Sequence, residues 1–306
     1  ADFPNIDPIP AGQWLLLRSP QVTLDPDKKG PTGAQVTLVA SQNAFRTADI
    51  GKFIKIYAGV VKITSLTDAK TLTGQILSIM TGTSDANPSA AAAGDWSLEI
   101  ASWSDATGFP RTGEFFQGRL GQASTPAQPT TFWLSSSDDY DDYAVGESAS
   151  KSIEYTMATR GLNQIQWLAD NIDMFVGTGG TEHRVTGGKQ DEPLGGDVIP
   201  LVSKQTSHGS AAIQPQVIDR RVVYIDRSRR QLYAITFDLE QDGYDSIEIT
   251  GGAEHITESK IRLGHFAFQR RLAPRFYFVR EDGVLIALTY HVREKVIGLT
   301  RIVTDG

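Results

Sequence analysis

The sequence predicts a nearly all-β fold in which antiparallel hairpins pack in a propeller-like arrangement, with an inserted small β domain. Short runs rich in β-branched and aromatic residues recur along the chain, turn residues separate them, and helical spacing is scarce. The composition is that of an ordinary folded protein, with 40% hydrophobic and 21% charged residues. Because 306 residues exceed the usual size of one domain, we expect two domains.

Three segments follow from the positions of these runs. We expect residues 1–21 to contribute lead-in strands of the propeller. Residues 22–102 are expected to form the inserted small β domain, and residues 103–306 the propeller-like domain.

The small domain is predicted from strand-like runs in the first third of the chain. Phe53–Tyr57 and Val60–Ile63 predict two neighbouring strands. Thr73–Met80 and Trp96–Ile100 flank the low-complexity segment Thr81–Gly94, whose Gly, Ser, Asn and Pro content is typical of a loop. The simplest interpretation is one long hairpin across this loop.

The later part of the chain repeats a strand, a polar turn and a second strand at intervals of about 55 residues. Repeats of this length built from hairpins indicate propeller blades. Glu281-Asp282-Gly283 is the strongest turn signal, because Asp-Gly readily adopts the positive φ angles of a tight hairpin turn. The three pairs are Asn163–Leu168 with Met174–Thr178, Arg221–Ile225 with Leu232–Ile235, and Arg275–Val279 with Leu285–Thr289.

One segment leaves helix and strand both open. Thr257 is suited to cap a helix that runs to Arg271, and Glu258 would lie in its first turn. The apolar residues of this segment fit strand alternation as well as a helical stripe. They are Ile261, Leu263, Phe266 and Phe268.

The charge is acidic, with a formal net charge of −7. Residues 1–150 contain 10 Lys and Arg against 16 Asp and Glu, and residues 151–306 contain 19 against 20. Neither half has the basic excess that binding a phosphate backbone from an exposed face requires. One cluster of arginines is interpreted as lying on exposed edges and turns. The alternative is a basic stripe on the surface of the folded protein. The members of the cluster are Arg220, Arg221, Arg227, Arg229 and Arg230.

The sequence offers no strong catalytic or metal-binding pattern. The absence of cysteine excludes a disulfide framework, a thiolate metal site and a cysteine nucleophile. The five histidines lack zinc-site spacing, and Ser207-His208-Gly209-Ser210 lacks the strand-to-helix context of a nucleophilic serine. No apolar run is long enough to predict a membrane span. We therefore expect a protein that is not an enzyme, with no catalytic residues, no cofactor, no metal and no membrane partner.

The acidic run Asp138–Glu147 has two interpretations. Its alternating carboxylates are a possible Ca²⁺ site, although the order of an EF-hand loop is absent. The favoured interpretation is a solvated acidic loop. If that loop faced a DNA channel, its charge would repel the DNA.

Six motifs follow one another in a distinctive order between residues 45 and 290. The best defined begins with Gly-Phe-Pro-Arg at 108–111 and continues to Arg119-Leu120, and a P-x-x-x-W-x-S element follows it. The residues that carry the six motifs are Asp49, Gly51, Gly108, Pro110, Arg111, Arg119, Pro129, Trp133, Ser135, Trp167, Gly177, Asp282, Gly283 and Thr289.

In this order the motifs resemble the tail tubular, or nozzle, proteins of short-tailed phages. Asp138 departs from that pattern, because family members usually have Gly there. The resemblance covers the central-to-late portion of a usual family member. It implies a virion structural protein, assembled in the host cytoplasm, that forms a homo-oligomeric ring, expected to be a hexamer.

The resemblance also implies the partners of such a ring. The ring lies below the portal and adaptor proteins, and its propeller-like domain lines the DNA exit channel. Double-stranded DNA passes through the lumen without sequence-specific binding during ejection. Tail fibres or spikes dock on the outside. Arg111 is expected to pair with a carboxylate or with backbone carbonyls, within one blade or across to its neighbour.

Two alternatives remain open on the same scaffold. The first is a tail-associated polysaccharide-degrading enzyme, which requires two convergent carboxylates. The second is a carbohydrate- or receptor-binding propeller, which requires exposed aromatic side chains on one face. The five tryptophans are interpreted as core residues rather than sugar-stacking ones. They are Trp14, Trp96, Trp103, Trp133 and Trp167.

Overall fold

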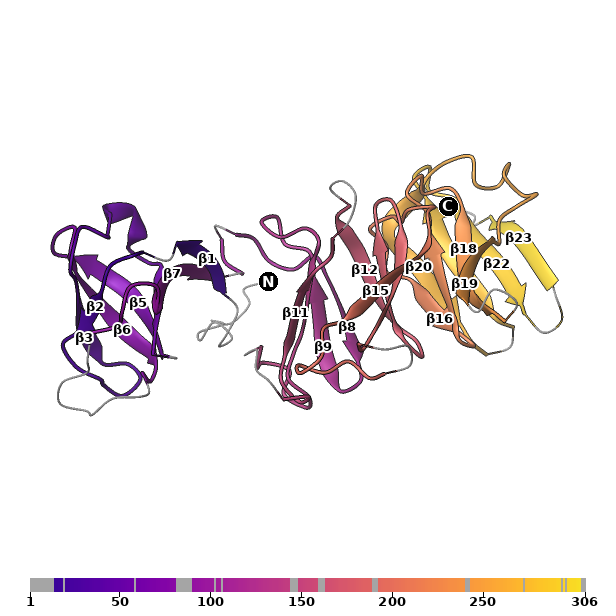
Figure 1. Ribbon diagram of the computed structural model, residues 1–306. Coiled ribbons are helices and arrows are strands. Elements are labelled where there is room, and N and C mark those ends of the chain that lie inside the picture. Colours follow the sequence, from indigo (N-terminus) through magenta and orange to yellow (C-terminus); the bar gives the residue numbers. More distant parts are fainter. Residues whose placement is uncertain are drawn as a thin grey trace. The chain divides into compact units, whose positions relative to one another are not determined.

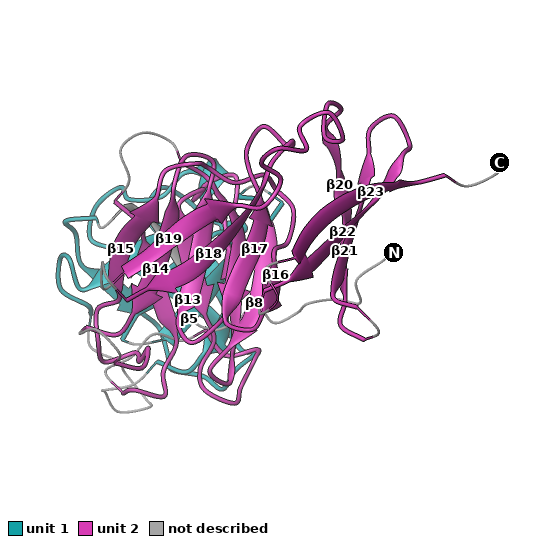
Figure 2. Cartoon of the chain, turned by 90° about the vertical axis from the view of Figure 1, so that its right-hand side faces the viewer, with its two compact units in different colours: residues 1–108 teal, residues 109–306 magenta. Residues whose placement is uncertain are grey.

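The computed structural model divides the chain into two compact units, Ala1–Gly108 and Phe109–Gly306 (Figure 2). This boundary lies six residues after the expected one, at 102/103. The structure describes residues 14–18, 20–57, 59–80, 90–101, 103–105, 107–143, 148–158, 163–188, 192–239, 243–271, 273–292, 294 and 296–303.

The first unit is one antiparallel sheet of seven strands in the order β1-β7-β4-β5-β6-β3-β2 (Figure 1). Alternate residues of its strands bury one core around Trp96, Phe45 and Leu38. The strands are β1 (Trp14–Arg18), β2 (Leu24–Pro26), β3 (Gln35–Ala40), β4 (Phe53–Ile56), β5 (Gly59–Leu66), β6 (Thr71–Ser78) and β7 (Trp96–Ala101).

Two expectations for this unit are wrong. β6 and β7 do not form one hairpin, because β6 pairs with β3 and β5 whereas β7 pairs with β4 and β1. Most of the loop expected between them, residues 81–89, lies outside the described residues. β1 belongs to this sheet and not to the propeller-like unit, so among the described residues the small domain is not inserted between blade strands.

The second unit consists of four sheets, each a four-stranded antiparallel meander in chain order. We name them blade 1 to blade 4. Blade 1 contains β8 (Thr112–Phe116), β9 (Arg119–Ala123), β10 (Thr131–Leu134) and β11 (Ile153–Thr156), and blade 2 contains β12 (Ile165–Asp170), β13 (Met174–Thr178), β14 (Glu182–Thr186) and β15 (Leu201–Thr206). Blade 3 contains β16 (Gln216–Ile218), β17 (Arg221–Ile225), β18 (Leu232–Asp238) and β19 (Gly243–Glu248), and blade 4 contains β20 (Ile261–Gln269), β21 (Arg275–Arg280), β22 (Leu285–His291) and β23 (Val296–Ile302).

The all-β, propeller-like fold class is therefore confirmed. The three predicted hairpins are β12–β13, β17–β18 and β21–β22. The ambiguous segment is a strand, β20, because Phe266 and Phe268 alternate onto Phe278 and Phe276 of β21. The described residues contain one 3₁₀ turn, Thr47–Asp49, and no α-helix.

In blades 2 and 3, alternate residues of the interior strands face opposite neighbouring blades. In β17, Val222 and Tyr224 pack in the core between blades 2 and 3, while Val223 and Ile225 pack in the core between blades 3 and 4. A third core, around Phe132 and other buried residues, joins blades 1 and 2. Because both faces of these two blades are buried, β13 and β17 are apolar at nearly every position rather than alternately.

Candidate functional site

The motif at 45–54 builds a turn in the first unit. Asp49 is buried and accepts hydrogen bonds from the backbone N–H of Arg46 at 2.9 Å and from Lys52 Nζ at 3.0 Å. Gly51 has φ +86°, which favours glycine, and its N–H donates to the carbonyl of Ile63. These two residues position the entry to β4. With Gly108 they lie in the first unit, whereas the motif residues from Pro110 onward lie in the second.

The Gly-Phe-Pro-Arg motif forms the entry to blade 1. Gly108 has φ +81° and exchanges backbone hydrogen bonds with Ser104. Pro110 precedes the first strand of the blade, and the backbone N–H of Arg111 donates to carbonyls at the end of β9. The Arg111 guanidinium donates to Gln166 Oε1 of β12 at 3.2 Å. Arg111 therefore reaches across to the neighbouring blade, but its acceptor is a side-chain amide and not the expected carboxylate or backbone carbonyl.

Arg119 is a buried cation held by backbone carbonyls. Its Nη1 donates to the carbonyls of Ser135 and Lys151 at 2.6 and 2.7 Å, and its Nη2 donates to the carbonyl of Ala149. Burial lowers the pKa of Arg119, while the nearby charges of Asp138 and Asp197 oppose that shift. Arg119 thus ties the end of β10 to the long segment that precedes β11, which sequence spacing alone did not indicate.

Trp133 and Ser135 are core residues of blade 1. The Ser135 Oγ accepts a hydrogen bond from the Leu120 N–H at 2.9 Å. Trp133 is fully buried and lies directly opposite Glu154 of β11. Burial raises the pKa of the Glu154 carboxyl, and a hydrogen bond from Trp133 opposes the shift. Pro129 accepts a hydrogen bond from the Ile165 N–H through its carbonyl and so connects blade 1 to blade 2.

Trp167 and Gly177 are cross-strand neighbours in blade 2. A Cβ atom at Gly177 would lie 2.1 Å from Trp167 Cε2, so only glycine leaves room for the indole. The indole packs against Tyr224 of blade 3 with ring centroids 5.6 Å apart. Both motif residues therefore serve the contact between blades 2 and 3.

Asp282 and Gly283 form the tight turn between β21 and β22. Gly283 has φ +88°, and Asp282 pairs with Arg280 and accepts a hydrogen bond from the Val284 N–H. The Arg280 hydrogen bond lowers the pKa of Asp282. Thr289 follows within β22, opposite Arg275 and Gly298. The motif residues thus occupy turns, cores and blade contacts, and they do not converge on one pocket.

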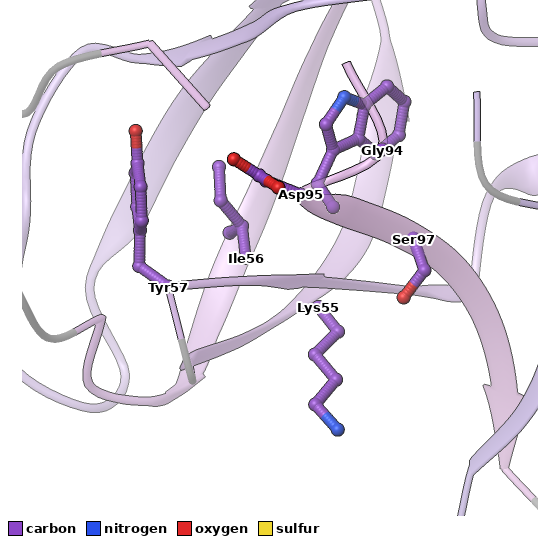
Figure 3. A pocket seen from close by; sticks show the side chains of 7 residues that line it. Lys55, Ile56, Tyr57, Gly94, Asp95 and Ser97 are labelled. Atoms are coloured by element: carbon purple, nitrogen blue, oxygen red, sulfur yellow. The ribbon is translucent and has the colours of Figure 1, made fainter. Parts of the chain in front are cut away.

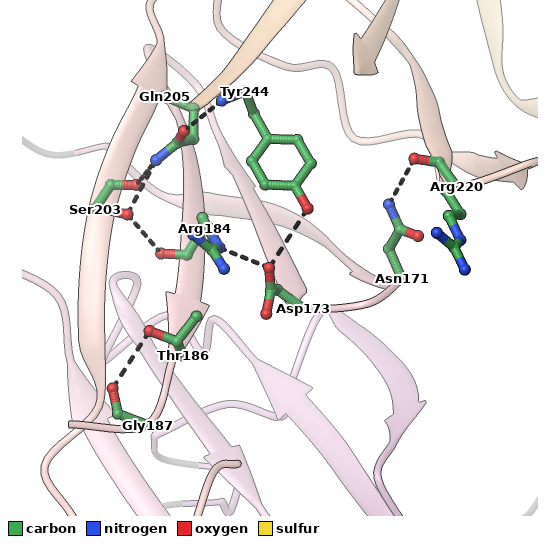
Figure 4. A network of polar contacts seen from close by, with 9 residues as sticks. All are labelled: Asn171, Asp173, Arg184, Thr186, Gly187, Ser203, Gln205, Arg220 and Tyr244. Atoms are coloured by element: carbon green, nitrogen blue, oxygen red, sulfur yellow. Dashed lines mark hydrogen bonds and ion pairs between the residues drawn. The ribbon is translucent and has the colours of Figure 1, made fainter. Parts of the chain in front are cut away.

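A polar network between blades 2 and 3 was missed by the sequence reasoning (Figure 4). Arg184 Nε donates to Asp173 Oδ2 at 2.6 Å, and the Arg184 guanidinium lies 5.5 Å from the centre of the Tyr244 ring. The Tyr244 N–H donates to Gln205 Oε1 at 3.1 Å. These contacts fix β19 of blade 3 against β14 and β15 of blade 2.

Glu182 is the centre of a second buried network at this interface. Its carboxylate accepts hydrogen bonds from Thr206 Oγ1 at 2.6 Å and Ser210 Oγ at 2.9 Å, and Thr206 in turn contacts Ser246 of blade 3. Burial raises the pKa of Tyr224, and the Glu182 charge adds to the shift. The available sequence signal was the polar run Glu182-His183-Arg184, which interrupts otherwise apolar strands of blade 2.

One small pocket lies in the first unit, between the end of β4 and the start of β7 (Figure 3). Its volume is about 190 Å³, below the several hundred Å³ typical of small-molecule sites. Burial and the charges of Asp25 and Asp95 raise the pKa of Tyr57. The Lys55 side chain points away from Asp95 in Figure 3, so these two groups do not form a catalytic pair there.

The candidate metal-binding and Ser-His residues of the sequence do not form a site. Within the described residues, no group of three or more His, Asp or Glu side chains is placed to hold a metal ion. His208 stacks on Tyr233, with ring centroids 4.2 Å apart, while Ser210 bonds to Glu182. Asp138, Asp139 and Asp141 are exposed, as expected of a solvated loop, and residues 144–147 of the acidic run lie outside the described residues.

The described carboxyls with raised pKa values do not converge either. Burial raises the pKa of Glu154 and of Asp170. Glu154 lies on the face of blade 1 opposite to its contact with blade 2, whereas Asp170 ends a strand of blade 2. A glycosidase needs two carboxyls flanking one bond, and this pair does not provide that arrangement.

Comparisons with known proteins identify no family for this chain. No family model and no curated protein matches the chain. Two similar solved structures are auxiliary nutrient binding proteins. The protein from Bacteroides ovatus has 8% identity and a TM-score of 0.40, with 91% of this chain and 85% of that one covered. The protein from Bacteroides thetaiotaomicron has 10% identity and a TM-score of 0.32, with 95% and 71% covered. Similarity at this level does not assign a function.

Among the described residues, none belongs to a helix with the length and apolar character needed to cross a bilayer.

Proposed function

We propose that this chain is a structural subunit of a phage tail nozzle, in which copies assemble into a ring around the DNA exit channel. The six motifs in nozzle-protein order support the proposal. In the structure, the motif residues form turns, blade cores and blade contacts, which suits a protein whose role depends on shape and assembly. The observation that carries the proposal is the open series of four blades in the second unit. Within the described residues of that unit, no further sheet packs on the outer faces of the two end blades.

The proposed ring has an expected subunit number and expected partners. Its homo-oligomer is expected to be a hexamer in the virion, in contact with adaptor or portal-side proteins and with fibres or spikes. Duplex DNA would pass without sequence-specific binding, consistent with an acidic chain that has no basic excess in either half.

The test is the mass and shape of the purified full chain. Mass photometry across a concentration series, with negative-stain electron microscopy, is expected to reveal a closed ring with six-fold symmetry and a central hole. A monomer at every concentration, or assemblies without a central hole, would contradict the proposal. Addition of the tail adaptor protein is expected to favour the ring, because binding to the assembled state stabilises it by mass action.

A second candidate function is binding of a carbohydrate or a receptor through an aromatic surface. Phe115 and Tyr140 are 56% and 45% exposed, and their ring centroids lie 5.2 Å apart. Exposed rings are suited to stacking on sugars.

Calorimetry with a panel of oligosaccharides separates the two candidates. The second predicts saturable binding that is lost in Phe115→Ala/Tyr140→Ala and kept in the matched variant Phe237→Ala, a 45% exposed aromatic of blade 3. Absence of binding in the wild-type chain would contradict the second candidate.

A further inference from the structure

The outer face of blade 4 repeats the pattern that the interior blades bury. In blade 3, the face toward blade 2 presents Val222, Tyr224, Tyr233 and Ile235, all at most 8% exposed. In blade 4, Phe276, Phe278, Ile286 and Leu288 pack against blade 3. The alternate residues of the same central strands are Tyr277, Val279, Leu285 and Ala287, which therefore point away from blade 3.

This second set lacks a covering sheet. Tyr277, Val279 and Leu285 are only partly buried, and Val296 at the rim of the same face is 48% exposed. The described residues of the second unit contain no further sheet packed against this side. A sheet face with apolar side chains in its centre is the feature by which blades 1 to 3 each join the next blade, so the face continues an established series of interfaces.

The outer face of blade 1 has a different character. Phe116 points toward blade 2, so Phe115 points outward, where its ring meets Tyr140 of the loop after β10. Tyr143 from the same loop is buried on this face and donates to the Leu120 carbonyl. Around the exposed ring pair lie Asp138, Asp139 and Asp141, which are exposed and form no ion pair within the described part of the chain.

The two end faces carry opposite charges at corresponding places. Asp138 lies beside the turn between the first and second strands of blade 1, since its N–H donates to the Gly118 carbonyl. The corresponding turn of blade 4, between β20 and β21, is bordered by Arg270, Arg271 and Arg275. These three are exposed and form no ion pair with other described residues. The acidic loop and the basic turn therefore stand at the same end of their blades.

Corresponding turns of adjacent blades meet within the chain. Asn171, in the β12–β13 turn of blade 2, donates to the carbonyl of Arg220, in the β16–β17 turn of blade 3, at 3.0 Å (Figure 4). If a second copy continued the series after blade 4, its blade 1 would place the acidic loop next to the basic turn. Opposite charges brought together in this way select partner and orientation.

We propose that blade 4 of one copy docks through its outer face onto the outer face of blade 1 of a second copy. The apolar residues Tyr277, Val279 and Leu285 cover the Phe115–Tyr140 pair, and the basic turn meets the acidic loop. Such a head-to-tail contact is heterologous, and it closes into a ring when the rotation per copy divides a full turn. This inference rests on the proposed function, because it names the surfaces through which the ring would form.

The first experiment reverses charge on one surface at a time in the full chain. Arg270→Glu/Arg271→Glu and Asp139→Lys/Asp141→Lys are each expected to weaken self-association roughly tenfold or more, measured by sedimentation velocity over a concentration series. The combined four-residue variant is expected to restore association, because both surfaces are then reversed. Arg227→Glu/Arg230→Glu reverses two exposed arginines in the turn at the opposite end of blade 3 and is expected to associate like the wild type.

The second experiment uses the absence of native cysteine. Copies carrying Tyr140→Cys are mixed with copies carrying Tyr277→Cys and treated with a short thiol cross-linker. Cross-linked dimers are expected in the mixture and not in either variant alone. Dimers within a single variant, or no cross-linking at concentrations where the wild type associates, would overturn the proposed contact.

The outcomes for the contact and for the ring are separable. A wild-type ring that persists in both charge-reversal variants overturns the contact and leaves the nozzle function standing. Charge-dependent, head-to-tail cross-linked chains that never close into a ring support the contact and contradict the nozzle function. A chain that stays monomeric throughout overturns both.

Discussion

Blade 3 and blade 4 share one strand order, yet of these two only blade 3 has sheets of the second unit packed against both faces, within the described residues. In β17 of blade 3, four consecutive residues from Val222 to Ile225 are at most 1% exposed. In β21 of blade 4, buried Phe276 and Phe278 alternate with the partly buried Tyr277 and Val279. The difference shows that burial in a meander of sheets depends on the neighbouring sheets and not on the strand alone.

Adjacent residues of β21 should show this contrast most clearly. Phe278→Ala is expected to lower the free energy of unfolding by about 3 to 5 kcal/mol, because it leaves a cavity between blades 3 and 4. Val279→Ala, one residue later on the outer face, is expected to cost less than about 1 kcal/mol in a monomeric sample. Urea denaturation measures both. Equal losses would mean that the outer face is covered.

Arg119 tests whether blade 1 depends on its own loops as the interior blades depend on their neighbours. Arg119→Ala is expected to cost about 3 to 4 kcal/mol, because it leaves three backbone carbonyls without their charged donor. Arg119→Lys keeps the charge but cannot reach all three acceptors, so it should fall between alanine and wild type. Thermal denaturation of the three proteins provides the measurement. A fully stable alanine variant would show that the carbonyl contacts are dispensable.

Gly177 tests how closely the buried interface between blades 2 and 3 is packed. Gly177→Ala is expected to cost about 2 to 3 kcal/mol, because the new Cβ overlaps the Trp167 indole. Adding Trp167→Phe should recover part of that loss, because the smaller ring leaves room for the methyl group. A double-mutant cycle from urea titrations measures the coupling. Strict additivity of the two changes would argue against direct overlap.

The buried Asp173–Arg184 ion pair within blade 2, beside Tyr244 of blade 3, should have a moderate effect. Asp173→Asn is expected to cost about 1 to 3 kcal/mol, because Asp173 and Arg184 are both largely buried. Glu281→Gln weakens the ion pair between Glu281 and Arg229, in which Glu281 is 48% exposed. This change should cost less than about 1 kcal/mol. Chemical denaturation of both variants gives the comparison. The reverse order of losses would refute the importance of burial here.

The smallest effect is expected from pH. Burial and the Lys204 charge lower the pKa of His183 below its ordinary value of 6.5. The unfolded chain therefore binds more protons at this residue than the folded chain does between the two pKa values. The contribution of neutral His183 to the free energy of unfolding is fully present above pH 6.5. It is lost as the pH falls from there through the lower pKa of the folded state. Melting temperatures from pH 8 to 5 should decline less in His183→Gln, and an identical decline would assign the effect to other groups.

Local chemistry explains which parts of the fold were predictable. The β21–β22 turn followed from Asp282-Gly283, because the required backbone conformation depends only on those residues. Blade 1 was not among the predicted hairpins, because Gly121 and Gln122 weaken the apolar alternation of β9. The polar networks around Asp173 and Glu182 were also missed, because each joins side chains from separate strands that sequence spacing does not bring together.

The sequence by itself determined that the chain forms short strands with tight turns, and its motif order is the basis of the proposed nozzle function. Only the tertiary structure decided that β6 and β7 separate, that Arg119 is held by the carbonyls of residues 135, 149 and 151, and that Gly177 makes room for Trp167. The two kinds of feature depend on residues at different separations along the chain. Turn and strand preferences depend on adjacent residues, whereas strand partners and buried contacts depend on which distant surfaces fit together.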